Sequence, residues 1–382
     1  MKFNCKTIHL KNALLKTERI ISKQITLPVL GNILLSVERG MLVVSSTNLE
    51  MAIKIYLGGK IEEEGQITVP ARILSGFLST IEDEVIEGEV EGEDLTVKTK
   101  KHQLKIKGMD AKEFPIIPAV SGEYFFKMEA ERINLFLSNI MISVARNDTR
   151  QELNGVLLRF FEDSLIFAST DSFRLSEVKI KLDKKNITEE YLIFIRSNPS
   201  VIIPAMALME LQKVFEKGEI EFKVDQNQFF IQNKEGKIVS RLINGNYPEY
   251  QQILPEKYET VVKVNKNELL SALKIALLVA GSQNGEVNIK SKEDKKGIVL
   301  ISQSMDSGEN VSEIAGEVAG GEFNMLFNCR YFLEGLGGLF SDKKEVLIKI
   351  NKKNTPVCLK GLDAQNQEKK KLSKVKMPFV KT

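Results

Sequence analysis

The strongest constraint on the fold of this 382-residue chain is an approximate threefold internal repeat. Three amphipathic stretches, at 10–23, 130–146 and 266–279, open three successive units of similar build. In the second stretch the apolar side chains recur at positions i, i+3, i+4, i+7, i+8 and i+11, which is the spacing of one helix face. Repetition on this scale predicts three similar structural units joined end to end.

Each unit continues with strands and then with a second helix. Runs in which apolar and polar residues alternate follow the first helices, at 31–55, 154–180 and 285–314. Second helices are expected at 70–81, 204–217 and 328–340. Further alternating strands follow them, such as those at 85–108 and 345–361.

Alternation with period two is typical of antiparallel strands that bury one face. The sequence therefore predicts an α+β fold in which each unit packs two helices on antiparallel sheets. The units, called here the first, second and third repeat, are expected as domains at 1–124, 125–257 and 258–382.

The composition suits a chain with sizeable hydrophobic cores, because 43% of the residues are hydrophobic and 27% are charged. No apolar run reaches the roughly 18 residues of a membrane helix. The start of the chain, MKFNCKTIHL, lacks the apolar core of an export signal. The cysteines, Cys5, Cys329 and Cys358, are odd in number and far apart, which indicates a reduced chain without disulfides. These features predict a cytoplasmic location.

Side chains that carry enzymatic chemistry are scarce. The two histidines, His9 and His102, show no zinc-ligand spacing, and the common nucleotide-binding and hydrolase motifs are absent. The acidic stretch 82–94 lacks the calcium-loop pattern and alternates like an exposed hairpin. We therefore expect no metal, no cofactor and no catalytic residue. An enzyme with its site at the polar loop Thr170–Arg174 stands as an alternative, although no histidine lies near that loop in sequence.

Positive charge is concentrated on the expected helices. The six helical stretches carry a net charge of +6 and the whole chain carries +3, so the other residues sum to −3. A basic helical surface suits the phosphate backbone of a nucleic acid. Helix propensity is an alternative cause, because lysine and arginine are good helix formers.

A family resemblance is carried by five stretches: TLPVLGNILLSV (26–37), ELNGVLLRF (152–160), STDSFRLSEV (169–178), NYPEYQQILP (246–255) and MPFV (377–380). In order and spacing they resemble the bacterial DNA polymerase III β subunit, the DNA sliding clamp, over essentially the whole chain. The resemblance implies three repeated clamp-type domains and a ring-forming, head-to-tail homodimer with helices around duplex DNA. It also implies a non-enzymatic processivity factor. The implied partners are double-stranded DNA, the DNA polymerase III core, the clamp loader and other clamp-binding proteins.

A clamp that slides needs weak contacts with phosphates that do not distinguish bases, and lysine and arginine supply them. The candidate DNA-facing residues are Lys11, Lys16, Arg19, Lys23, Arg72, Lys213 and Lys274. Arg19 and Lys23 are favoured among them, because they lie in a basic run just before the loop QITLPVLGN.

The resemblance also implies a pocket for partner peptides between the second and third repeats. The matching positions are Arg150, Leu153, Thr170, Arg174, Leu175, Pro248, Ile253, Asn328, Tyr331, Val375, Met377, Pro378 and Phe379. A linear peptide with large apolar side chains needs an apolar slot with a polar rim. Leu153, Leu175 and Ile253, with Val375 and Met377, suit the slot, and the two arginines suit the rim. Ser172 stands where the family often has glycine, so the loop has less backbone freedom.

The implied dimer interface pairs an edge strand of the first repeat with the third repeat of the partner. The matching strand, HQLKIKG (102–108), places Leu104 and Ile106 on one face, and the matching partner stretch lies around Leu278 and Val279. Two identical junctions then close the dimer. A repeat scaffold that assembles without meeting DNA stands as a second alternative.

The polar loop of the second repeat has a counterpart in the first. ASTDSFRLSEV (168–178) matches VSSTNLEMAIK (44–54), and the two threonines are separated by 123 positions. The Ser–Thr–Asp cluster is therefore partly a device of the repeat, which disfavours catalysis. On this comparison Arg174-Leu175 is expected where the first repeat has Glu50-Met51, and these two residues are the expected functional difference.

Overall fold

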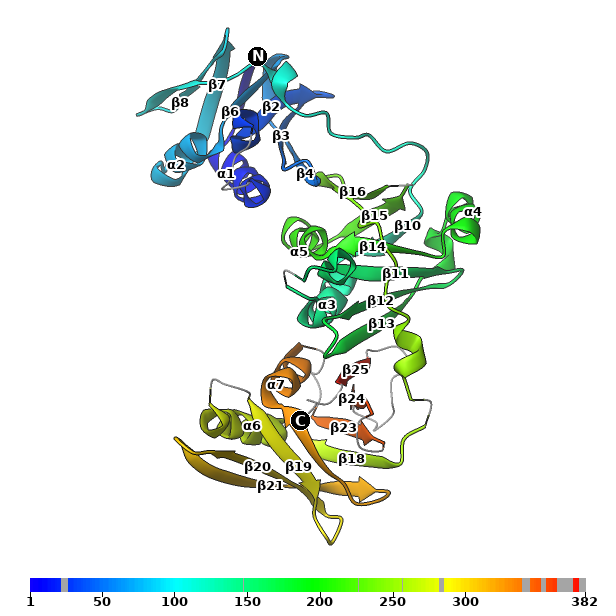
Figure 1. The fold of residues 1–382 in the computed structure, drawn as a ribbon. Coiled ribbons are helices and arrows are strands. Elements are labelled where there is room, and N and C mark those ends of the chain that lie inside the picture. Colours follow the sequence, from blue (N-terminus) through cyan, green and yellow to red (C-terminus); the bar gives the residue numbers. More distant parts are fainter. Residues whose placement is uncertain are drawn as a thin grey trace. The chain divides into compact units, whose positions relative to one another are not determined.

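Figure 1 shows the computed structural model of the chain, which describes residues 1–21, 27–146, 148–225, 227–255, 257–281, 285–338, 344–351, 355–362 and 374–377. The chain forms two compact units, each built from several segments. The first unit comprises Met1–Arg132, Lys185–Phe194 and Met206–Leu242. The second comprises Ile133–Lys184, Ile195–Ala205 and Ile243–Thr382.

The first unit contains two antiparallel sheets. The smaller sheet has the strand order β5 (Lys60–Glu63), β1 (Lys2–Lys6), β7 (Val85–Glu91), β8 (Asp94–Lys98) and β9 (Gln103–Lys107). The larger sheet has the order β10 (Phe126–Glu129), β15 (Glu219–Val224), β16 (Gln228–Asn233), β17 (Gly236–Arg241), β4 (Met51–Leu57), β3 (Met41–Thr47), β2 (Asn32–Glu38) and β6 (Gln66–Pro70). The hairpin expected at 82–94 is confirmed as β7 and β8, in which Leu95 and Val97 alternate with less buried neighbours.

The second unit contains one antiparallel sheet of 12 strands. The first part of its order is β14 (Ser200–Pro204), β11 (Gly155–Phe161), β12 (Ser164–Thr170), β13 (Leu175–Lys181), β25 (Lys374–Met377), β24 (Val357–Gly361) and β23 (Glu345–Ile350). The order continues with β18 (Thr260–Asn265), β21 (Gly308–Ala319), β20 (Gly297–Ser304), β19 (Glu286–Ser291) and β22 (Asn324–Asn328). The α+β class predicted from the sequence is confirmed.

Strand pairing joins neighbouring repeats. Strand β17 of the second repeat pairs with β4 of the first, which places Ser240 opposite Met51. Strand β25 of the third repeat pairs with β13 of the second, which places Lys376 opposite Leu175. Neighbouring repeats therefore share one continuous sheet at each of these junctions.

Six helices lie in the predicted ranges. They are α1 (Thr7–Thr17), α2 (Ala71–Thr80), α3 (Ala130–Ile140), α5 (Ala205–Val214), α6 (Lys266–Ala280) and α7 (Cys329–Gly338). Helix α3 ends at Ile140, before the end of the expected stretch 130–146, and is followed by the 3-10 turn η4 (Met141–Ser143). The expected helix at 10–23 begins three residues earlier, directly after β1, and passes into the 3-10 turn η1 (Glu18–Ile20). A further helix, α4 (Glu189–Ser197), was not predicted, and it occurs in the second repeat between β13 and β14.

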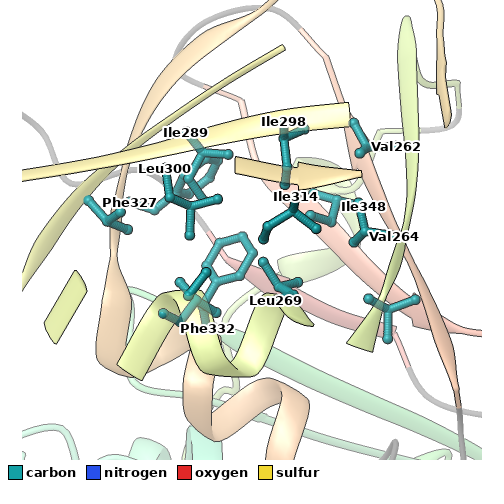
Figure 2. Close-up of a cluster of buried hydrophobic side chains, with 14 of the residues drawn as sticks. Val262, Val264, Leu269, Ile289, Ile298, Leu300, Ile314, Phe327, Phe332 and Ile348 are labelled. Carbon is teal, nitrogen blue, oxygen red and sulfur yellow. The ribbon is translucent and has the colours of Figure 1, made fainter. Parts of the chain in front are cut away.

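The core of the third repeat shows how each helix pair is held. Figure 2 shows Leu269 of α6 and Phe332 of α7 pointing at apolar side chains from the strands. Both are fully buried. The Phe332 ring meets the ring of Phe327 edge-on at 4.9 Å between centroids, a favoured aromatic geometry. Asn265 caps α6, since its side-chain oxygen accepts hydrogen bonds from the backbone N–H groups of Asn267 and Glu268.

All three cysteines are buried thiols. Burial raises the pKa of the Cys5 thiol to about 12 and that of Cys329 to about 11, so neither is a reactive thiolate. Both histidines are exposed. No helix among the described residues is long and apolar enough to cross a membrane. In the same part of the chain, no group of three or more histidine, cysteine and acidic residues is placed to hold a metal.

One buried cation in the first unit makes the stability of the fold depend on pH. Lys237 of β17 is 8% exposed, and its ammonium donates a hydrogen bond to the carbonyl oxygen of Pro118 at 3.0 Å. Burial, with a smaller effect of the nearby Lys54 charge, lowers the pKa of Lys237 from 10.5 to about 8. The charged form is therefore penalised in the folded chain and not in the unfolded chain.

We expect Lys237→Met to stabilise the chain at pH 7 by about 1–2 kcal/mol, after allowance for solvent screening. Between pH 8 and pH 10.5 the unfolded chain binds more protons at Lys237 than the folded chain does, so the wild type gains stability as the pH rises. The advantage of the variant should therefore shrink above pH 8. Urea denaturation at pH 7, 8 and 9 measures it, with Lys234→Met in the exposed preceding turn as the control. A pH-independent difference would contradict the assignment.

Candidate functional site

The loop after β12 is held by the side chain of Asp171. One carboxylate oxygen accepts hydrogen bonds from the backbone N–H groups of Phe173 and Arg174, at 3.0 and 2.8 Å. The other accepts from Nε of Arg174 at 2.9 Å. Both oxygens are therefore occupied in forming a turn, which is the common local role of aspartate. The carboxylate of the loop itself is therefore engaged in structure, which disfavours a role for it as a catalytic base.

Arg174 is the centre of a cluster that joins the loop to α7. Its guanidinium lies over the ring of Tyr331 at 4.5 Å from the centroid and donates a hydrogen bond to Glu334. Burial would lower the pKa of Arg174, but the hydrogen bond to Glu334 and the charge of Asp171 outweigh it, and the pKa is raised. The side chain is only 12% exposed. The arginine is thus fixed in place by an aromatic ring and two carboxylates.

Arg150 reaches the same loop from its other side. Its guanidinium donates a hydrogen bond to Oγ of Ser172 at 2.8 Å and pairs with Asp148 at 3.3 Å. Ser172 adopts a φ of 74°, in the left-handed region that favours glycine. A non-glycine residue there costs about 1 kcal/mol or more. The bond from Arg150 is one contact that holds this strained residue.

The two leucines expected in the apolar slot are buried. Leu153 is 0% exposed and Leu175 is 3% exposed. Leu175 belongs to an apolar cluster with Tyr250, against which Tyr247 packs. The hydroxyl of Tyr247 accepts a hydrogen bond from the backbone N–H of Thr170 at 3.0 Å. Burial raises the pKa of Tyr247, so the hydroxyl stays neutral at physiological pH.

The other pocket candidates differ in their exposure and in their contacts. Pro248 and Ile253 are exposed, and Ile253 is 58% exposed. Asn328 caps α7 by accepting hydrogen bonds from the backbone N–H groups of Arg330 and Tyr331. Val375 lies opposite Ser176 and Met377 lies opposite Val357 in the backbone of β25. Pro378 and Phe379 fall outside the described residues.

The first repeat builds the same loop with different side chains. Thr47 Oγ1 accepts from the N–H of Leu49 and donates to the carbonyl of Met51, as Thr170 Oγ1 does with Ser172 and Arg174. Leu49, like Ser172, has a φ of 74°.

These bonds align the two repeats with a constant offset of 123, which pairs Arg174 with Met51 and Leu175 with Ala52. The expected pairing of Arg174-Leu175 with Glu50-Met51 is therefore wrong by one residue. The strand register agrees, because Thr47 lies opposite Ala52 and Thr170 opposite Leu175.

The candidate DNA-facing residues fall into two groups. Arg72 of α2 and Lys274 of α6 are exposed, and Lys11 of α1 is half-buried. Lys16, Arg19 and Lys213 instead make contacts within the first unit. Lys23 falls outside the described residues.

The candidate dimer residues occupy one strand and one helix end. Leu104 of β9 is half-buried and Ile106 is 2% exposed, so this face of the strand points into its own repeat. Leu278, near the end of α6, is 79% exposed, and Val279 is half-buried. An exposed leucine of this kind suits an interface.

Two residues that contact the Thr170–Arg174 loop were not predicted from the sequence. Glu334 is 160 positions from Arg174 in the chain, and Tyr247 is 77 positions from Thr170. Glu334 was detectable in part, because Tyr331 and Glu334 are three residues apart and so share one face of the predicted helix. Tyr247 lies in the stretch NYPEYQQILP (246–255), which carries the resemblance, so a signal for it was present beside Pro248.

Models of the three domains of the DNA polymerase III β subunit match this chain in order. The N-terminal domain matches residues 1–118, the central domain 127–249 and the C-terminal domain 251–379. The β sliding clamp of Synechococcus elongatus is 28% identical over 371 residues, covering 95% of this chain and 96% of the relative. The β sliding clamp of Staphylococcus epidermidis is 25% identical over 358 residues, covering 91% and 92%.

Solved structures of sliding clamps share the fold. The clamp of Bacillus subtilis matches with a TM-score of 0.90 at 23% identity, covering 100% of this chain and 99% of that chain. The clamp of Pseudomonas aeruginosa bound to griselimycin matches with a TM-score of 0.88 at 22% identity, covering 100% of both chains. Together with the three consecutive domain matches, these similarities show that the chain belongs to the bacterial DNA polymerase III β subunit family, the β sliding clamps.

Proposed function

We propose that this protein is a DNA sliding clamp, a non-enzymatic processivity factor whose copies join head to tail in a ring around duplex DNA. Membership of the β sliding clamp family supports the function. The main structural support for the proposed ring is the strand pairing that joins neighbouring repeats. The division into domains at 1–124, 125–257 and 258–382, the absence of a cofactor and a cytoplasmic location belong to the same proposal.

Each repeat contributes two equivalent sets of strands. In one set, β1-β7-β8-β9 corresponds to β10-β15-β16-β17 and to β18-β23-β24-β25. In the other, β4-β3-β2-β6 corresponds to β13-β12-β11-β14 and to β21-β20-β19-β22. At both junctions within the chain, the last strand of the first set pairs with the first-named strand of the second set in the preceding repeat. These pairs are β17 with β4 and β25 with β13.

One strand of each kind is left without this partner among the described residues. Strand β9 pairs with β8 alone, and residues 308–315 of β21 pair with β20 alone. Unpaired edges are templates for another chain. If the junction rule of the chain also holds between copies, β9 of one copy pairs with β21 of the next. Leu278 and Val279 lie on the helix that packs against β21, which supports their place at this junction.

DNA contact in this proposal is electrostatic and independent of sequence. Arg72, Lys274 and Lys11 supply positive charge from three of the helices. Such contacts with phosphates are weak one by one and do not distinguish bases. Retention on DNA then comes from the closed ring. Sliding is unhindered, because no tight contact with the DNA has to dissociate at each step.

Partner binding is assigned to the Arg174 cluster and the surface beside it. Exposed Ile253 and Pro248 supply apolar contact area, and the half-exposed guanidinium of Arg150 supplies N–H groups at the rim. Arg174 is 12% exposed and is engaged by Asp171 and Glu334, so it orders the loop beside that rim. A short peptide with apolar anchors and an acidic group suits this combination. The expected occupants are segments of the DNA polymerase III core, the clamp loader and other clamp-binding proteins. Because Asp171 is consumed by the turn, the arrangement favours binding over catalysis at this loop.

Retention on circular DNA tests the topological mechanism. We expect protein loaded on a nicked circle by a clamp loader to stay bound, and to be lost once the circle is cut, because a ring can slide off an end. Native mass should be near twice the 43.0 kDa of one chain. Gel filtration of the loaded DNA before and after linearisation measures the difference. Equal retention on both forms would rule out the ring, and a stable dimer that never loads would favour the scaffold alternative.

A further inference from the structure

A single buried carboxylate holds two of the candidate DNA-facing cations. Glu210 lies on α5 and is 6% exposed. One of its oxygens accepts a hydrogen bond from Nε of Arg19 at 2.7 Å, and the other accepts from the ammonium of Lys213 at 2.9 Å. All three residues belong to the first unit. The carboxylate is therefore fully engaged, with one cation on each oxygen.

The contact joins the first repeat to the second. Arg19 lies in η1 directly after α1, whereas Glu210 and Lys213 lie on α5. Lys16, one turn earlier on α1, donates a hydrogen bond to the carbonyl oxygen of Val214 at 2.9 Å, at the C-terminal end of α5. A cation at that end of a helix is favourable, because the carbonyl groups there carry partial negative charge.

Both cations keep a face open to solvent although they are tied to the acid. The Arg19 side chain is 40% exposed and the Lys213 side chain is 37% exposed. The bond from Nε of Arg19 leaves the two terminal nitrogens of the guanidinium available in geometry for a phosphate oxygen. A phosphate that approaches this surface meets two cations and one carboxylate, with a net charge of +1 instead of +2.

We propose that Glu210 limits the attraction between the clamp and DNA by holding Arg19 and Lys213 and cancelling part of their charge. The inference rests on the proposed function and adds to it a residue that sets how loosely the ring holds phosphates. Glu210 is a positioning residue here, since it acts on DNA through the two cations. Screening by an attached carboxylate lowers the affinity that these cations give and the friction on sliding.

The opposite role, in which Glu210 increases affinity by orienting the cations, is disfavoured by their chemistry. Lysine and arginine have long, flexible side chains that reach phosphates in many geometries. Contacts that do not read sequence need no fixed orientation. Loss of the carboxylate therefore costs little positioning and adds one unit of positive charge.

Glu210→Gln tests the proposal, because the amide keeps the size of the side chain and removes its charge. We expect it to bind a short linear duplex about 3–10-fold more tightly at low salt than wild type. The slope of log affinity against log salt should steepen by about 1 to 2, since each additional phosphate neutralised contributes about 0.9. Fluorescence anisotropy between about 20 and 200 mM KCl measures both quantities.

The matched control is Glu216→Gln, which makes the same change of net charge at an exposed position just after α5. It should leave the slope at the wild-type value. Adding Arg19→Gln and Lys213→Gln to Glu210→Gln should remove the gain, because the effect passes through these two cations. A slope for Glu210→Gln equal to that of Glu216→Gln, or weaker binding than wild type, overturns the proposal.

Measurements of folding distinguish this role of Glu210 from a purely structural one. Thermal unfolding and native mass identify any variant that has lost its fold, and Glu210→Asp, which keeps the charge, should restore the wild-type slope. Loading of the wild type on circular DNA tests the proposed function itself. Wild type that loads, combined with an unchanged slope for Glu210→Gln, refutes this inference alone.

Discussion

Replacing Arg174 by glutamine is expected to weaken the binding of a polymerase-derived clamp-binding peptide by roughly 30-fold or more, or about 2 kcal/mol. The change removes the cation over the Tyr331 ring and leaves Asp171 and Glu334 without their shared partner. An acidic group on the peptide then meets two carboxylates that have lost their shared cation. Fluorescence polarisation with a labelled peptide measures the loss.

The control for this experiment is Arg196→Gln, which removes an exposed arginine from α4. Its peptide affinity should equal that of wild type, and both variants should keep the native mass. If Arg174→Gln bound the peptide as tightly as Arg196→Gln does, the Arg174 cluster would not be the partner site.

Replacing Phe332 by alanine is expected to lower the unfolding free energy of the third repeat by about 3–5 kcal/mol. The side chain is fully buried between α7 and the strands, and its ring contacts Phe327 (Figure 2). Removing it leaves a cavity in a core that has little freedom to collapse. Denaturant unfolding followed by circular dichroism measures the change.

Phe173→Ala is the matched control, because the same substitution there removes a ring that is 60% exposed. It should cost less than about 1 kcal/mol. A loss of the same size for both variants would mean that the core of the third repeat does not limit stability.

The parts of the fold that sequence could predict are those set by local patterns. Alternation located the strand runs of all three repeats, and helical spacing located six helices. Helix α4 was not predicted, because its buried aromatic, Tyr191, is followed by the exposed Leu192 and Ile193 and the segment is too short for a clear apolar face. The strand pairing between repeats was also not predicted, because β17 and β4 pair through backbone N–H and C=O groups, which carry no sequence signal.

The residues of the candidate site that could be predicted are those that the internal repeat or the family resemblance indicated. Arg174 and Tyr331 were named and do meet. Glu334 and Tyr247 are not among the predicted residues, because neither the repeat nor the resemblance assigned them a contact with this loop. The error in matching Arg174 with Glu50 arises because the ends of the two stretches were matched and not their threonines. The separation of 123 between the threonines is also the offset of the shared hydrogen bonds.

Because β17 pairs with β4 and β25 pairs with β13, we expect that a single repeat cut from the chain does not fold stably alone. A fragment cut near residue 124 keeps β4 but loses the strand that covers its edge. The complementary fragment carries β17 with its own edge bare. Each piece then presents a row of unsatisfied backbone groups, which is a template for aggregation. Threefold repetition of the sequence therefore does not make the three repeats interchangeable modules, and engineered recombination of clamps should exchange whole shared sheets.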